Sequence, residues 1–173
     1  MDLKEAILKE HSKRQTQLIA EYIGSNQKRV DELMHLFFFA EYRVVQRASW
    51  VVSYCAEAHP VLIAKHFAPL IQNLSKPGLH DAVKRNTLKV LQDLDAPDEL
   101  LGTLVDLCFG FIYSPSEAIA VKAISINILV KTCIKYPELK EELIPLLNEL
   151  LNHGAPAIIY CAKRGLEVFR KTK

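Results

Sequence analysis

The chain has 173 residues, of which 50% are hydrophobic and 24% are charged, and its formal net charge at pH 7 is +2. This is the composition of an ordinary globular protein, long enough to bury a sizeable core, and it excludes a low-complexity or fibrous chain. So small a net charge gives no argument by itself for binding nucleic acid or a membrane.

The first predicted element is one long helix over residues 2–24, which Gly24-Ser25-Asn26 ends. It is rich in Lys, Glu, Gln and Leu, as is typical of an end cap whose outer face meets water. The N-terminal residues contain no apolar segment like that of a secretory signal, and the longest uncharged run is too short to cross a bilayer. We therefore expect a cytoplasmic protein that does not enter membranes.

After this cap, the sequence predicts helices in pairs. Prolines at positions 60, 97 and 137 mark the starts of three of them, where a missing N–H costs nothing. The first helices of the pairs are predicted at 27–39, 60–74, 97–112 and 137–151, and the second helices at 41–57, 80–94, 117–134 and 156–171.

The second helices repeat with a period of 38 residues. An apolar residue opens each copy, and another follows seven positions later, which marks two turns of one helix face. The opening residues are Val45, Val83, Val121 and Ile159, and their partners are Val52, Val90, Ile128 and Leu166. The pattern predicts that both of these residues belong to the core in each of the first three copies.

The first helices keep the same period. Leu33, Ile71, Phe109 and Leu147 share one register position. Pro69 and Pro145 lie inside two first helices, two periods apart, where a proline costs about 3 kcal/mol in an isolated helix. Its return at one repeat position predicts a kink that the architecture uses.

These residues resemble HEAT repeats. The segments Pro69–Leu74 and Pro145–Leu150 match that family's first helix, and Asp81–Arg85 matches the start of its second, although Asp31 and Leu107 replace the kink proline in two repeats. The resemblance implies an all-α, right-handed α-α superhelix: a HEAT-like solenoid with a cap helix and four helix pairs. We expect a single domain over 1–173, with the cap at 1–25 and repeats at about 26–58, 59–95, 96–135 and 136–173.

No sequence motif for nucleotide binding, nucleophilic catalysis or metal ligation is present, so we predict neither an enzyme nor a cofactor or metal site. The four cysteines form no C-x-x-C motif, and most of them lie in apolar helical patterns. They are predicted to be buried, reduced thiols.

One set of residues is a candidate binding site. In HEAT-like arrays the second helices line the concave side, and the face opposite the core positions carries basic and aromatic residues on the early repeats and apolar residues further on. The candidates are Arg43, Arg47, Trp50, Tyr54, Lys84, Arg85, Leu88, Ile126 and Arg164. The same pattern allows another interpretation, in which Trp50, Leu88 and Ile126 are core between repeats and the arginines bond helix ends.

The leading hypothesis is a non-enzymatic scaffold that holds a protein or peptide segment, of acidic and amphipathic character, in this groove. An alternative is a nucleic-acid-binding protein of the DNA-alkylation-repair-like HEAT type, although Asp81 is the only acidic residue on the stripe. A second alternative is self-association through the apolar face of the second helix in the third pair, predicted at 117–134. The oligomeric state stays open.

Overall fold

Every secondary-structure element within residues 1–171, the part of the chain that the computed structural model describes, is helical. This confirms the predicted all-α class. The elements are α1 (Leu3–Lys9), α2 (Lys13–Ile23), α3 (Gln27–Phe39), α4 (Tyr42–Ala58), α5 (Pro60–Ala64), α6 (Phe67–Leu74), α7 (Asp81–Asp93), α8 (Asp98–Tyr113), α9 (Ile119–Lys135), the 3₁₀ turn η1 (Pro137–Leu139), α10 (Lys140–His153) and α11 (Pro156–Lys171).

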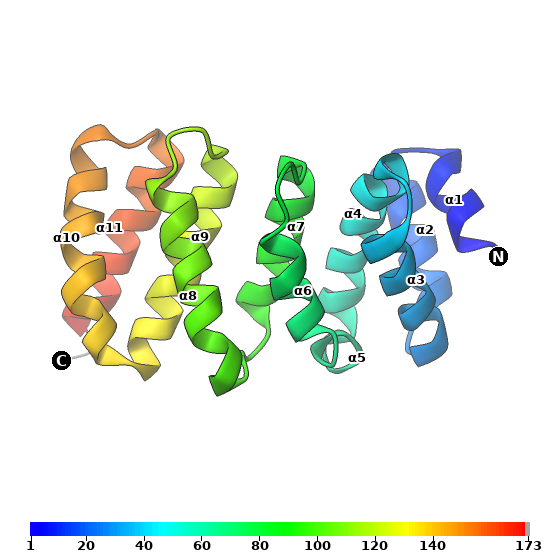
Figure 1. Cartoon of the computed structure of the whole chain (residues 1–173), viewed down its shortest axis with the longest axis horizontal. Helices are drawn as coiled ribbons and strands as arrows, with labels where there is room; N and C mark the ends of the chain where they lie inside the picture. Colours follow the sequence, from blue (N-terminus) through cyan, green and yellow to red (C-terminus); the bar gives the residue numbers. More distant parts are fainter. Residues whose placement is uncertain (172–173) are drawn as a thin grey trace. The chain divides into compact units, whose positions relative to one another are not determined.

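The helices form two compact units, Met1–Pro97 and Asp98–Lys173. Figure 1 colours the first unit from blue to green and the second from green to red. The single domain over 1–173 and the right-handed sense of the whole array therefore stay predictions.

In the first unit, α4 is the central helix. It packs against α3, its partner in the first pair, and also against α2 and α7. The first helices α3 and α6 lie in front of α4 and α7 in Figure 1, so the pairs form two layers. The apolar face of α4 includes Val44, Ala48, Val51, Val52 and Cys55, all of them buried.

The second unit repeats this plan. α9 packs against α8 and α11, and α10 packs against α11. Gly165 of α11 lies where α11 comes closest to its neighbours, since a Cβ added there would lie 2.7 Å from Cγ2 of Val130 on α9. This tight approach requires a residue without a side chain.

The predicted core register of the second helices is largely confirmed. Five of the six valine and isoleucine positions are buried: Val52, Val83, Val90, Val121 and Ile128. Val45 differs, because it is half-buried and lines a pocket between α4 and α7.

Two predicted helices are broken, so the prediction of nine helices is wrong for the described residues, which contain eleven α-helices. The cap is two short helices, because Ser12 adopts an extended conformation and its Oγ accepts a hydrogen bond from the Gln15 N–H as the N-cap of α2. The first helix of the second repeat breaks at Lys65 and His66, just before Pro69. Pro145, by contrast, stays inside α10.

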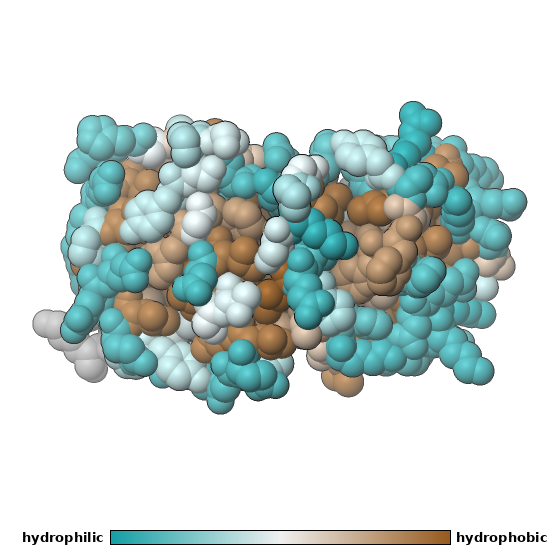
Figure 2. All heavy atoms as spheres, viewed as in Figure 1, coloured by the Kyte–Doolittle hydropathy of each residue, from teal (hydrophilic) through white to brown (hydrophobic). Residues whose placement is uncertain are grey.

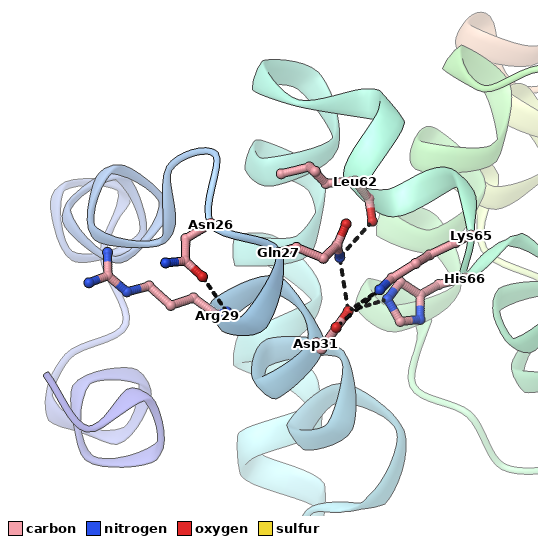
Figure 3. A network of polar contacts seen from close by, with 7 residues as sticks. All are labelled: Asn26, Gln27, Arg29, Asp31, Leu62, Lys65 and His66. Carbon is pink, nitrogen blue, oxygen red and sulfur yellow. Dashed lines mark hydrogen bonds and ion pairs between the residues drawn. The ribbon is translucent and has the colours of Figure 1, made fainter.

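A polar network holds α3 against this break (Figure 3). The Asp31 carboxylate lies 2.8 Å from the Lys65 ammonium and 3.1 Å from Nε2 of His66. Gln27 donates from Nε2 both to Asp31, at 2.9 Å, and to the carbonyl oxygen of Leu62, at 3.3 Å. Asp31, which takes the place of the kink proline in the first repeat, thus binds the two residues at which the first helix of the second repeat is broken.

Candidate binding surface of the first unit

Trp50 of α4 and Arg85 of α7 line a small pocket. Its volume is about 240 Å³, and its lining comes from the α1–α2 connection, from α4 and from the start of α7. The lining residues are His11, Gln46, Trp50, Ala82, Arg85 and Asn86.

Trp50 forms one wall of this pocket. Its side chain is half-buried, and the ring of His11 meets it edge-on, with 5.5 Å between the ring centroids. Tyr54 lies one turn further along α4 on the same helix face, with 6.4 Å between its ring centroid and that of Trp50. Trp50 is therefore neither fully inside the core nor fully in solvent, and it presents an aromatic surface to whatever enters the pocket.

Arg85 gives the pocket lining a positive charge. Arg85 is exposed, and its guanidinium lies at hydrogen-bond distance, 3.4 Å, from the side-chain oxygen of Asn86. Asn86 is buried and donates to the Ser49 hydroxyl at 2.9 Å, which links α7 to α4. These bonds hold the pocket walls in place and leave the outer side of Arg85 accessible.

Arg47 has a structural role. Its Nη1 donates to the carbonyl oxygens of Ile7, at 3.3 Å, and Leu8, at 2.8 Å, in the last turn of α1. These carbonyls have no partner within the helix, so a guanidinium satisfies them and also favours the negative end of the helix dipole. The structure therefore supports the interpretation in which Arg47 bonds to a helix end.

The remaining candidates divide between surface and core. Arg43 is exposed at the start of α4, Lys84 is half-buried on α7, and Arg164 is exposed on α11 of the second unit. Leu88 and Ile126, by contrast, have 0% of their surface exposed. These two residues are core and line no groove, which corrects the prediction and removes Ile126 from the apolar face invoked for self-association.

Sequence reasoning missed His11, Gln46 and Asn86 as pocket residues. His11 was placed inside a continuous cap helix, whereas the break at residues 10–12 brings it against Trp50. The signal that could have found it is Ser12, a favoured N-cap residue, with Gln15 three positions later, the spacing of a capping box.

The cysteines carry no sign of reactive chemistry. All four are free and buried, as predicted. Burial raises the pKa of the Cys55 and Cys108 thiols to about 12 and that of Cys133 to about 11. Each is therefore a protonated, unreactive thiol at neutral pH. Within residues 1–171, no group of three or more His, Cys, Asp or Glu side chains could hold a metal ion.

Among these same residues, no helix combines the length and the apolar character that crossing a bilayer requires. No curated protein and no solved structure matches the chain significantly. A family model described as HEAT repeat domain matches residues 3–168, a range that begins with α1 and ends within α11. The chain therefore belongs to the HEAT-repeat family.

Proposed function

We propose that this chain is a non-enzymatic HEAT-repeat scaffold that binds a segment of a partner protein at the Trp50 pocket. HEAT repeats commonly mediate interactions between proteins, and the observation that carries the proposal is that the half-buried Trp50 and the exposed Arg85 line one pocket. Trp and Arg are the residue types most enriched among those that dominate binding energy at protein interfaces.

The size of the pocket supports a protein partner over a metabolite. Small-molecule sites usually measure about 300–1,000 Å³. A volume of about 240 Å³ is below that range, and it suits one or two side chains of a larger partner. The partner's chemistry follows from the walls: an apolar side chain against Trp50 and a carboxylate against Arg85.

The alternative of nucleic-acid binding loses support from the role of Arg47. A protein grips duplex DNA by neutralising several phosphates with Lys and Arg. Arg47 is bonded to the end of α1, which leaves Arg43 and Arg85 as the exposed arginines of this surface. Two arginines are too few for a strong grip on phosphates.

Trp50 is the only tryptophan, so its emission reports directly on the pocket. The test titrates the protein with an acetylated, amphipathic peptide of Leu and Glu and follows this emission together with the anisotropy of the labelled peptide. We expect Arg85→Ala to weaken binding at least 5-fold and Trp50→Ala about 30-fold. The matched control Arg170→Ala, an exposed arginine of α11, should bind as the unmodified protein does.

A salt titration with the peptide and with a 15-base-pair DNA duplex separates the partner classes. Duplex binding falls with salt at a log–log slope of about −0.9 for each phosphate contacted, whereas a peptide held mainly by Trp50 responds much less. Binding of the duplex that is tighter than that of the peptide and collapses with salt would overturn the proposal. So would a peptide affinity that is unchanged in both Trp50→Ala and Arg85→Ala.

A further inference from the structure

A second pocket lies in the first unit, and it shares no lining residue with the Trp50 pocket. It has a volume of about 190 Å³ and is formed by the end of α3, the start of α4, the end of α6, the α6–α7 connection and the start of α7. Its lining residues are Phe37, Phe38, Tyr42, Val45, Asn73, Lys76, Gly78, Leu79, His80 and Val83.

The notable polar group of this pocket is Asn73, in the last turn of α6. Its side chain is 3% exposed, and its Nδ2 has no hydrogen-bond partner. Nearly all buried polar groups in native proteins are hydrogen-bonded, so each exception calls for an explanation. An amide donor beside an empty pocket is explained if a ligand in that pocket supplies the acceptor.

The rim of the pocket is aromatic and exposed. Phe39 follows the lining residue Phe38 and is 73% exposed, and Tyr42 is 63% exposed. Figure 2 shows hydrophobic atoms gathered over the C-terminal half of α3, with hydrophilic atoms around them. Large aromatic side chains left in solvent near a pocket are typical of a surface that a partner covers.

The charge of the lining is positive. Lys76 is its charged residue, and no carboxylate is among the lining residues. His80 accepts from the Ala82 N–H at Nδ1, with 3.0 Å between the nitrogens. Of the neighbouring carboxylates, Glu41 is paired with Lys4 at 3.1 Å, and Asp81 is exposed. The pocket therefore favours an acceptor with negative charge.

The volume of the pocket limits which ligand can both contact its apolar lining and supply a negatively charged acceptor. About 190 Å³ is the space of roughly six water molecules, enough for one residue and too small for a typical metabolite. The apolar group and the anionic acceptor must therefore belong to the same residue. A C-terminal residue with an apolar side chain carries both, and capture of a terminal carboxylate is a known mode of peptide recognition.

We propose that this pocket binds the apolar C-terminal residue of a partner polypeptide. The side chain packs against Phe37, Phe38 and Val83, and the terminal carboxylate accepts hydrogen bonds from Asn73 and Lys76. Because the Asn73 amide is buried, it rotates toward the pocket when the carboxylate enters. The site goes beyond the Trp50 pocket and does not rest on it, since different residues form each.

The test uses N-acetyl-phenylalanine as the probe and N-acetyl-phenylalaninamide as the matched neutral compound, followed by protein NMR. For a ligand of this size we expect a Kd on the order of 1 mM for the acid, with shifts at Asn73 and its neighbours. The amide should bind about 10-fold more weakly. Equal binding of acid and amide would overturn the proposal, and so would shifts confined to residues outside this pocket.

Two variants check the assigned groups. Asn73→Leu removes the amide and keeps an apolar side chain, and Lys76→Gln removes the charge from an exposed position. Each should reduce the preference for the acid at least 3-fold, while Lys28→Gln, on an exposed part of α3, should leave it unchanged. Full retention of the preference in Lys76→Gln would contradict the proposal even if Asn73→Leu failed to fold.

Discussion

Arg47 of α4 donates a hydrogen bond at 2.8 Å to the carbonyl oxygen of Leu8, 39 residues earlier in the chain. Gln15 of α2 donates to the preceding turn of α1, from Nε2 to the carbonyl oxygen of Ala6, at 2.8 Å. α1 has only seven residues, fewer than an isolated helix needs for stability in water. Side chains from two other helices therefore satisfy its open C-terminal carbonyls.

Arg47→Ala is expected to lower the free energy of unfolding by about 1–2 kcal/mol, because a charge-assisted bond to a helix end is lost. Hydrogen exchange should show the loss first in the amides of α1. Arg43→Ala, one turn away and exposed, is the control and should change stability by less than about 0.5 kcal/mol. Equal effects of the two substitutions would show that Arg47 does not hold α1.

The repeat register predicts the cost of truncating the core. Val52→Ala and Val90→Ala should each lower the free energy of unfolding by roughly 1–3 kcal/mol, since each leaves a cavity in place of a buried side chain. Val61→Ala on α5 serves as control, because Val61 is 82% exposed. Urea denaturation measures all three, and neutral results at both buried sites would contradict the register.

These two cases show what sequence could and could not predict. The 38-residue register depends on burial that recurs from repeat to repeat, so it identifies the buried Val52, Val83, Val90, Val121 and Ile128 without a structure, whereas Val45, Ile159 and Leu166 are half-buried. Predicted bounds such as 27–39 for α3 were also correct. The buried residues of the cap do not follow the 38-residue period, because they precede the corresponding residues of α4 by 32 positions. Thr16, Ile19 and Ile23 correspond to Ala48, Val51 and Cys55.

The candidate site was harder to predict for a related reason. A helical wheel gives the direction of a side chain and says nothing of what neighbouring helices cover. Trp50, Leu88 and Ile126 share one wheel position, yet Trp50 is half-buried while the other two are fully buried. Only the packing of neighbouring helices decides which of them a partner can reach: α2 and α7 beside Trp50 on α4, and α8 and α11 beside Ile126 on α9.

The Asp31 network predicts a pH dependence. The hydrogen bond with Lys65 is the main reason that the pKa of the Asp31 carboxyl lies below its ordinary value. A lowered pKa means that the carboxylate stabilises the fold above the ordinary pKa and that this contribution is lost as the pH falls through the lowered value.

Asp31→Asn should therefore be less stable than the unmodified protein at pH 7, by no more than about 1 kcal/mol because the ion pair is exposed. The difference should begin to shrink as the pH falls below about 4 and should close once the pH is below the lowered pKa of Asp31. Thermal unfolding at a series of pH values tests this, with the exposed Asp106→Asn as reference. A difference that persisted unchanged in acid would assign the role of Asp31 to packing instead of charge.

Replacing glycine by alanine is expected to raise the free energy of unfolding in α8 and to lower it in α11. Gly102 and Gly110 of α8 have open space around them, so replacing either by alanine improves helix propensity without a clash. Each substitution should raise the free energy of unfolding by about 0.5–1 kcal/mol. Gly165→Ala in α11 gains the same propensity, but its new methyl group would lie 2.7 Å from Cγ2 of Val130 and 3.1 Å from Cδ1 of Leu147.

The Val130 methyl cannot easily move aside, because a β-branched side chain has essentially one rotamer in a helix. Overpacking of this kind typically costs about 1–3 kcal/mol, which exceeds the gain in propensity. We therefore expect Gly165→Ala to be net destabilising, and Gly165→Ala combined with Val130→Ala to be less destabilising than the two single effects added together. Chemical denaturation of the four proteins gives this coupling directly. If Gly165→Ala stabilises as Gly102→Ala does, α11 does not approach α9 as closely as described here.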